Sequence, residues 1–336
     1  MIRIVITAGI LALTAVVPSM ASAQQIKIAA LAPDGSSWME SLKAAGDRIE
    51  QGSDGAVRIR FYPGGVMGDA DTVLRRIRLG QLHGGVFTVG ELAGVAPESN
   101  LYSLPFQFRD AEELAALRDE FDPIILDALY EAGMMAPAII NGGFAYLFSR
   151  EPIRAPEDVS TDLRVWIPEG DALSRRTLSR IGASAVPMSM AEVYTGLQTG
   201  TLNTFASTVS GAIILQWHTR ANYMLDLPVL MTAGTLAIDR RMFDRLEPAH
   251  QALVRSEFAA ALRAQAAAVD EENANAREAL LEEGIEIVQP DPSGVAEWTR
   301  LSNEVLNEML ESGDYDVPGI QRLRERLAEL RAADER

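Results

Sequence analysis

Between Pro248 and Gly284 the sequence contains neither glycine nor proline and is rich in alanine, glutamate, leucine and arginine. This composition predicts one continuous helix, because these residues have high helix propensity and nothing interrupts them. At 1.5 Å per residue the helix would be ~50 Å long, which is more than the width of one lobe of an α/β protein. We therefore expect two lobes that share this helix as a spine.

The N-terminal part of the chain alternates strand and helix signals. A buried strand begins near Ile26, and Ser36 or Ser37 can cap the helix that follows. Another strand begins at Val57, with apolar residues alternating with arginines, and Asp69 can cap the next helix. This order implies parallel strands joined by right-handed crossovers, so the predicted fold class is α/β, with each lobe a sheet flanked by helices.

The middle and the C-terminal part continue this alternation. Residues 134–149 and 163–167 are predicted to be extended, Ser189 and Glu192 form a capping box, and further helices are expected near 294–312 and 317–333. Without repeats or low-complexity linkers, we expect interleaved lobes joined by strand hinges. The predicted bounds are lobe I at 24–148 and 232–262, lobe II at 149–231, the second half of the long helix with the return to lobe II at 263–312, and a C-terminal helix at 313–336.

The N-terminus carries the features of an export signal. Arg3 precedes an apolar run that ends at Pro18, and Ala21-Ser22-Ala23 is a small-residue cleavage pattern. The run is shorter than the ~20 residues that span a bilayer. Residues 1–23 are therefore predicted to be a cleaved signal peptide, and the mature protein is expected to be soluble in the periplasm.

Composition and motifs exclude several classes of function. The chain has no cysteine and a formal net charge of −17, which argues against thiol chemistry, against nucleic acid and against docking on anionic lipid. The three histidines show no metal-ligand spacing, and neither a nucleophile elbow nor a phosphate-binding loop is present. We predict a binding protein that is not an enzyme and needs no cofactor or metal.

Four segments give the chain a resemblance to one family: residues 32–38 (APDGSSW), 65–68 (GVMG), 103–106 (SLPF) and 190–200 (MAEVYTGLQTG). In this order and spacing, the sequence resembles the DctP-type solute-binding proteins of tripartite ATP-independent periplasmic (TRAP) transporters, over nearly all of the mature chain. The resemblance implies two α/β lobes that close over a small organic solute, and a permease with small and large membrane subunits as partner. We expect a monomer.

The positions that bind ligand in this family depart from its usual pattern. Relatives hold a carboxylate with an arginine in a strand that ends in proline, and the matching position here is Trp166, with Arg164 ~7 Å away on the same face of the strand. A second basic position falls on Phe144, and an amide position on Ser207. The full set of expected ligand contacts is Trp38, Phe87, Thr88, Phe144, Trp166, Glu169, Tyr194 and Ser207.

Aromatic walls suit a cation, a polyol or an aromatic ligand, whereas a buried carboxylate needs a guanidinium partner. The sequence therefore predicts a neutral, cationic or polyol solute. An organic acid held by a non-standard arginine is the alternative, with Arg154, Arg175 and Arg176 nearest in sequence. An exported two-lobed enzyme and a sensory protein that serves a receptor also stay open.

Overall fold

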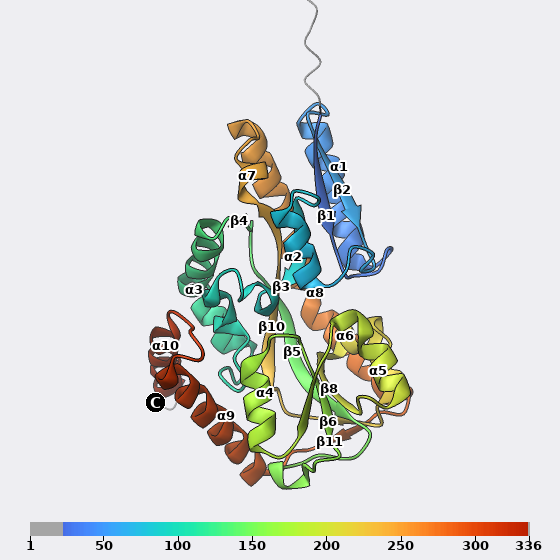
Figure 1. Cartoon of the computed structure of the whole chain (residues 1–336), viewed down its shortest axis with the longest axis vertical. Coiled ribbons are helices and arrows are strands. Elements are labelled where there is room, and N and C mark those ends of the chain that lie inside the picture. Colours follow the sequence, from blue (N-terminus) through green and yellow to red (C-terminus); the bar gives the residue numbers. More distant parts are fainter. Residues whose placement is uncertain (1–22, 335–336) are drawn as a thin grey trace, which may run out of the picture.

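The computed structural model describes residues 23–334, which form two lobes (Figure 1). The predicted signal peptide lies outside the described residues except for Ala23. Between residues 23 and 334, no helix combines the length and the apolar character needed to cross a bilayer.

The strands and helices follow the predicted α/β alternation. The strands are β1 (Gln24–Ala29), β2 (Val57–Tyr62), β3 (Gly84–Thr88), β4 (Met134–Met135), β5 (Ile140–Ser149), β6 (Arg164–Ile167), β7 (Ser184–Pro187), β8 (Thr204–Thr208), β9 (Tyr223–Leu225), β10 (Leu230–Asp239) and β11 (Glu286–Val288). The α-helices are α1 (Ser37–Gly52), α2 (Ala70–Arg78), α3 (Ala111–Glu131), α4 (Ala172–Arg180), α5 (Val193–Thr199), α6 (Val209–Ile214), α7 (Arg240–Phe243), α8 (Pro248–Glu282), α9 (Pro292–Ser312) and α10 (Ile320–Asp334). Short 3₁₀ turns are η1 (Gly90–Leu92), η2 (Pro97–Tyr102), η3 (Pro156–Asp158), η4 (Met190–Glu192) and η5 (Trp217–Arg220).

One sheet runs through both lobes in the order β2-β1-β3-β10-β5-β8-β6-β7. In lobe I, β1 pairs in parallel with β2 and β3, as predicted from the strand–helix alternation. In lobe II, β6 pairs in parallel with β7 and β8. The long antiparallel strands β10 and β5 lie between these two groups, so the polypeptide that joins the lobes is itself part of the sheet.

Lobe I is a three-layer unit. On one face, Ile26 and Ile28 of β1 pack against Leu42 of α1 and Phe258 of α8. On the other face, helices α2, α3, α9 and α10 cover the sheet. The predicted caps are present, because Ser36 Oγ accepts the Met39 amide at 3.3 Å and Asp69 Oδ1 accepts the Thr72 amide at 2.8 Å. These caps fix where α1 and α2 begin, at the edge of lobe I that faces lobe II.

Lobe II has an aromatic core on one face of its sheet. Phe148 stacks on Phe205 with ring centroids 5.0 Å apart, and Trp217 contacts both Phe205 and Trp166 edge to face. Helices α5 and α6 and the last turns of α8 cover this face, and Trp298 of α9 packs on the other. Such ring pairs contribute beyond the area they bury, so lobe II has a rigid core of its own.

The joint between the lobes contains an irregular pair of strands. The register of β10 against β5 shifts between Thr232 and Ala233, and Gly143 opposite has a φ of +91°. Thr232 Oγ1 donates to the Gly143 carbonyl at 2.8 Å, and Asn141 Oδ1 accepts the Gly143 amide at 2.7 Å. A β-bulge bends its strand, so this place is suited to a hinge. The predicted lobe bounds at 148/149 and 231/232 lie nearby and stay predictions.

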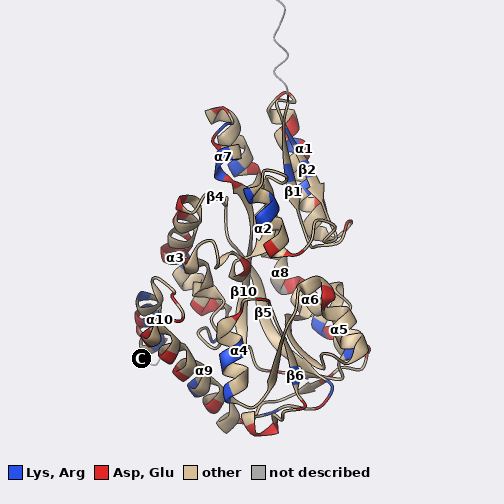
Figure 2. Cartoon of the chain, in the orientation of Figure 1, with Lys and Arg blue, Asp and Glu red and all other residues tan. Residues whose placement is uncertain are grey.

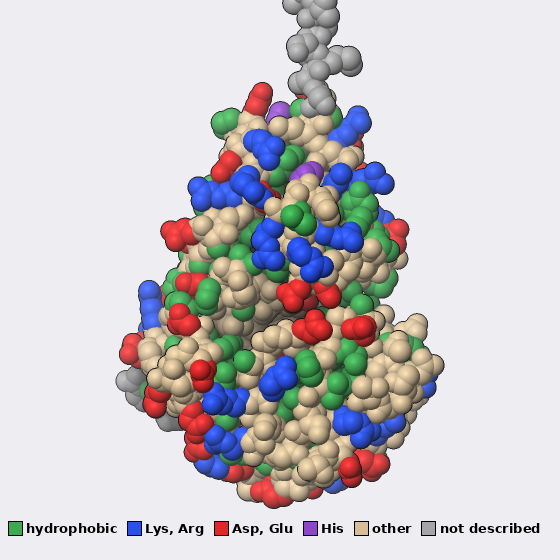
Figure 3. Space-filling model, in the orientation of Figure 1, with side chains coloured by type: hydrophobic (Ala, Val, Ile, Leu, Met, Phe, Trp, Pro, Cys, Tyr) green, Lys and Arg blue, Asp and Glu red, His purple; other side chains and the backbone are tan. Residues whose placement is uncertain are grey.

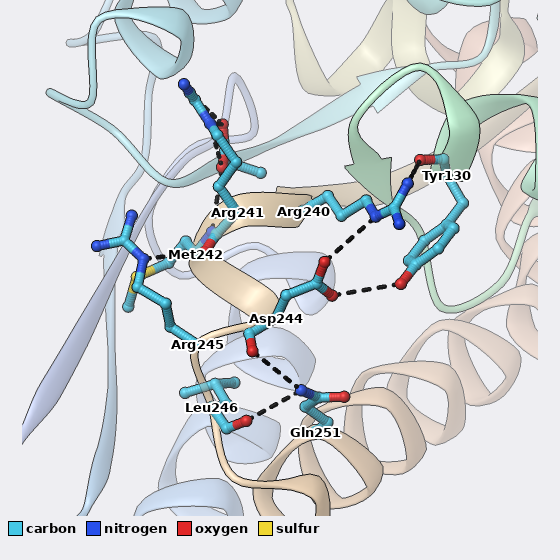
Figure 4. Close-up of polar contacts among 9 residues, drawn as sticks. Tyr130, Arg240, Arg241, Met242, Asp244, Arg245, Leu246 and Gln251 are labelled. Carbon is cyan, nitrogen blue, oxygen red and sulfur yellow. Dashed lines mark hydrogen bonds and ion pairs between the residues drawn. The ribbon is translucent and has the colours of Figure 1, made fainter.

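The predicted spine is confirmed as α8, a helix of 35 residues. It packs against α1 of lobe I and against β5 and α6 on the lobe II side. Its first turn is held at the far end of lobe I, where Asp244 accepts from Arg240 at 3.2 Å and from Tyr130 at 3.3 Å, while Gln251 of α8 donates to the Leu246 carbonyl at 2.9 Å (Figure 4). The spine is thereby anchored to β10 through α7.

Candidate functional site

A cleft of about 290 Å³ separates the two lobes. Figure 3 shows the hollow on one face of the molecule, with acidic side chains along its edges, and the ribbon in Figure 2 is coloured for acidic residues at the start of α2. The carboxyl ends of parallel strands β1 and β3 meet at this edge of lobe I, as is usual for ligand sites in α/β proteins. The hinge strands β5 and β10 and the helix α8 form the floor.

The lobe I wall carries the cleft's larger polar and aromatic groups. It includes Trp38 from the first turn of α1, Asp69 from the cap of α2, Phe87 and Thr88 from the end of β3, and Glu91 from the turn η1 that follows. A Cβ built on Gly234 of β10 would lie 4.0 Å from the Trp38 ring, and Gly234 pairs with Thr88. The indole, Thr88 and the floor strand therefore adjoin one another.

Glu91 is fixed by the end of β3. One carboxylate oxygen, Oε2, accepts the Thr88 amide at 2.8 Å and the Thr88 hydroxyl at 3.0 Å. Burial raises the pKa of Glu91 above its usual value; the hydrogen bonds from Thr88 oppose this shift, and the negative charges of Asp71 and Asp69 add to it. The carboxyl group is thus positioned at the cleft in surroundings that do not neutralise its charge.

The lobe II wall is made of small, apolar and hydroxyl-bearing groups. Its members are Met190, Ala191, Thr208, Ser210, Gly211, Ile214 and Leu215. Thr208 Oγ1 accepts the Gly211 amide at 3.0 Å and so caps α6. Ser210 is tied to the spine, because its amide donates to Asn273 Oδ1 of α8 at 3.2 Å. Lobe II therefore presents the capped start of α6 to the cleft.

The charges in the cleft are all of one sign. Among the described residues that line it, the ionisable ones are Asp69, Glu91 and Glu272, and none is lysine, arginine or histidine. Glu272 is on α8, where its Oε1 accepts from Ser37 at 3.1 Å and from Gln265 at 3.2 Å. No group of three acidic or histidine side chains that the structure describes is arranged to hold a metal ion.

The structure brings together some of the residues predicted from the sequence and separates others. Trp38, Phe87 and Thr88 line the cleft, although Phe87 is 3 % exposed and packs mainly into the core of lobe I. Phe144 packs against that core as well. Glu169 is exposed on the turn after β6, and Ser207 lies on β8 next to the lining residue Thr208.

Trp166 and Tyr194 belong to lobe II outside the cleft wall. Trp166 is 8 % exposed, its indole Nε1 donates to the Met188 carbonyl at 2.9 Å, and its ring lies against Trp217 with centroids 5.1 Å apart. Tyr194 receives a hydrogen bond from Arg220 at 3.2 Å. Trp166, at the position of the family's arginine, is therefore a core residue in this structure, because Trp217 from a distant part of the sequence packs against its ring.

The arginines of the alternative hypothesis also lie outside the cleft wall. Arg164 is committed to main-chain carbonyls, with Nε donating to Gly200 at 3.1 Å. Arg176 pairs with Asp314 of the segment after α9 at 3.0 Å, and Arg154 and Arg175 are exposed. Sequence reasoning missed Asp69, Glu91 and Glu272 as cleft residues. The cap signal located Asp69, but nothing local indicated that these three share one cavity.

Comparisons with known proteins agree with this architecture. The family model described as "bacterial extracellular solute-binding protein, family 7" (DctP) matches residues 28–312. A solute-binding protein of Chromohalobacter salexigens is 24% identical over 254 residues, 75% of each chain. The 2,3-diketo-L-gulonate-binding periplasmic protein YiaO of Escherichia coli is 23% identical over 248 residues, covering 73% of this chain and 75% of that protein.

Solved structures show the same fold. A TRAP periplasmic solute-binding protein from Xanthobacter autotrophicus, with bound β-D-galacturonate, superposes with a TM-score of 0.82 at 21% identity, covering 90% of this chain and 99% of that one. The family match spans most of the chain and includes both lobes and the spine. The chain belongs to family 7 of the bacterial extracellular solute-binding proteins.

Proposed function

We propose that this protein captures a small organic solute by closing its two lobes and delivers it to a TRAP-type membrane transporter. The observation that carries the proposal is a single cleft whose walls come from both lobes and whose floor contains an irregular strand pair. A solute that contacts both walls is bound fully only in the closed form, so it shifts the population towards closure. A permease can then distinguish the loaded protein from the empty one by shape.

The proposed setting is the periplasm, with the small and large TRAP membrane subunits as partners and the protein acting as a monomer. The family match, the names of the relatives and the N-terminal export pattern support this setting. Co-purification with the two membrane subunits in detergent, only when a bound solute has closed the lobes, is the expected result. Equal capture of the empty protein would contradict the proposal.

The proposed solute is neutral or cationic. Several relatives of known structure hold sugar acids, including β-D-galacturonate in the Xanthobacter protein. A buried carboxylate without a cationic partner costs several kcal/mol, of the order of 3 or more. In this cleft the described lining residues supply three carboxyl groups and no cation, so an anionic solute would meet repulsion.

An organic acid remains the second candidate because of those relatives and because of Arg76. This guanidinium reaches Met67, a residue of the cleft lining, with Nη1 3.1 Å from Sδ. A rotation of Arg76 past Met67 would bring a cation to the cleft edge. Loss of sugar-acid binding in Arg76→Ala would favour this candidate.

The deciding experiment is a thermal-shift screen of sugar acids, polyols and organic cations, followed by small-angle scattering of each compound that stabilises. We expect stabilisation by uncharged or cationic compounds with a decrease in the radius of gyration. Stabilisation by carboxylates alone would overturn the proposed solute class. Ligand binding at one molecule per chain without compaction would overturn the closing mechanism, and turnover of a bound compound would identify an enzyme instead.

A further inference from the structure

The three carboxyl groups of the cleft have the same pattern of hydrogen bonds. Each uses one oxygen within the protein: Asp69 Oδ1 for the Thr72 amide, Glu91 Oε2 for Thr88, and Glu272 Oε1 for Ser37 and Gln265. For the second oxygen of each, the described part of the chain offers no hydrogen-bond donor, and none of the three forms an ion pair there. Three acceptor oxygens of cleft-lining residues therefore have no hydrogen-bond donor among the described residues.

The buried carboxylates Glu113 and Asp239 and the half-buried Asp122 have arginine partners, unlike the three carboxyl groups of the cleft. Glu113 is bound by Arg331 through both oxygens, at 2.7 and 2.8 Å, and Asp122 by Arg118 at 2.7 Å. A carboxylate taken out of water is normally paired, because its desolvation otherwise goes uncompensated. A positively charged ligand would therefore supply the partner that the carboxyl groups of the cleft lack.

Trp38 supplies a second feature suited to a cation. Its ring is half-buried above Gly234 on the floor, and Gly234 is the register partner of Thr88, whose amide and hydroxyl hold Glu91. Its neighbour Ser37 donates to Glu272. The indole thus lies near residues that hold two of the carboxyl groups, Thr88 for Glu91 and Ser37 for Glu272. A cation over an indole face gains about 0.5–2 kcal/mol from the ring quadrupole.

Resting on the proposed function, we propose that the captured solute carries a protonated amine, which donates to the open oxygens of Glu91 and Glu272 and lies against Trp38. A primary or secondary ammonium fits better than a quaternary one, because open carboxylate oxygens accept hydrogen bonds and a quaternary nitrogen has none to donate. The rest of the solute meets the hydroxyl and apolar groups of lobe II. This is a more specific solute class than a neutral or cationic one.

The test uses four-carbon compounds of equal length that differ in charge. Succinate, butanediol, aminobutanol and putrescine are titrated into the mature protein by calorimetry and thermal shift, with D-galacturonate beside them. We expect binding by aminobutanol and putrescine, with butanediol at least ~10-fold weaker and both acids inactive, since a charge-assisted hydrogen bond is about twice as strong as a neutral one. Butanediol binding as tightly as aminobutanol, or no response to either amine, would overturn the inference.

Variants test whether amine binding depends on Glu91 and Glu272. Glu91→Gln and Glu272→Gln keep the shape and remove the charge, and each is expected to weaken amine binding about 10-fold or more. Glu271→Gln is the matched control, because this glutamate is exposed on the same helix beside Glu272. Equal affinity in Glu91→Gln and the parent protein would refute the role of Glu91.

The two proposals fail in different ways. If galacturonate or butanediol binds and compacts the protein while the amines do not, solute capture stands and the amine inference is wrong. If the amines bind and small-angle scattering shows no compaction, the amine site stands and capture by closure is wrong.

Discussion

The two walls of the cleft differ in kind. The wall from lobe I carries Trp38, Asp69 and Glu91, whereas the wall from lobe II carries residues such as Met190, Ala191 and Thr208 and, among the described lining residues, no charge. Lobe II has large aromatic side chains too, but Phe148, Trp166, Phe205 and Trp217 are all in its core. Large aromatic side chains thus line the cleft on lobe I and form the core of lobe II.

This difference suggests a division of labour. Recognition of a solute depends on groups with direction and charge, and these lie on lobe I and the spine. Closure depends on a surface that excludes water and fits many shapes, and small apolar and hydroxyl groups on lobe II provide it. If this is right, substitutions on lobe II should mainly lower stability, and substitutions on lobe I should mainly lower affinity for the solute.

The largest expected effect is on lobe II. Trp166→Ala removes a buried indole and its hydrogen bond to Met188, and we expect the free energy of unfolding to fall by about 4 kcal/mol. Urea denaturation of the isolated protein measures this loss. Solute affinity of the protein that remains folded should change less than threefold. A large loss of affinity with little loss of stability would mean that Trp166 belongs to the cleft wall after all.

The joint between the walls comes next. Gly143→Ala places a Cβ 2.5 Å from Nδ2 of Asn273 at a φ of +91°, and Asn273 also accepts the Ser210 amide of the lobe II wall. We expect the free energy of unfolding to fall by about 2–3 kcal/mol, from backbone strain and the displacement of Asn273 together. Urea denaturation measures this loss. Small-angle scattering should show weaker compaction of the variant when solute is added.

Gly133→Ala is the control for Gly143. It has a φ of +94° with nothing within 4 Å of the added Cβ, so only the backbone strain applies. We expect the free energy of unfolding to fall by about 1 kcal/mol in Gly133→Ala, with the same compaction on solute binding as in the parent protein. Equal effects at the two positions would show that Asn273 moves aside freely and that this joint is not the hinge.

On lobe I we expect the larger effect on affinity and the smaller effect on stability. Trp38→Ala removes a half-buried ring at the cleft, so affinity for the solute should fall about 10-fold while stability falls by less than in Trp166→Ala. Calorimetric titration and urea denaturation of the same preparation give both quantities. A stability loss as large as that of Trp166→Ala, with affinity kept, would remove the distinction between the two walls.

Much of the fold was predictable because its signals are local. The absence of glycine and proline between residues 249 and 283 defines α8, and the caps Ser36 and Asp69 define where α1 and α2 begin. Alternation of strand and helix also predicted the parallel pairing of β1 with β2 and β3. Each of these features depends on residues a few positions apart, so the sequence alone contains them.

The cleft was less predictable because it depends on distant packing. Strand periodicity places Trp166 on one face of β6, but only the arrival of Trp217, about fifty residues later, makes that face the core. Glu272 is one glutamate among several on α8, and its place at the cleft follows from how α8 crosses α1. The negative charge of the cleft likewise comes from three separate segments, and no local pattern in the sequence connects them.

The smallest expected effect concerns the charge of the lobe I wall. Burial, followed by the neighbouring carboxylates, raises the pKa of Glu91 in the folded protein, so its ionised form opposes folding above that pKa. Glu91→Gln should therefore be more stable than the parent protein at pH 8, and this difference in stability should close as the pH falls into the ordinary carboxyl range. Glu113→Gln provides the opposite case: burial acts on that carboxyl too, but Arg331 lowers its pKa on balance, so the variant should be less stable at pH 8. Urea denaturation of the three proteins from pH 4 to pH 8 measures both differences. If Glu91→Gln loses stability at pH 8 as Glu113→Gln does, the lobe I wall already holds a cationic partner for Glu91, and the contrast between the two walls would have to be redrawn.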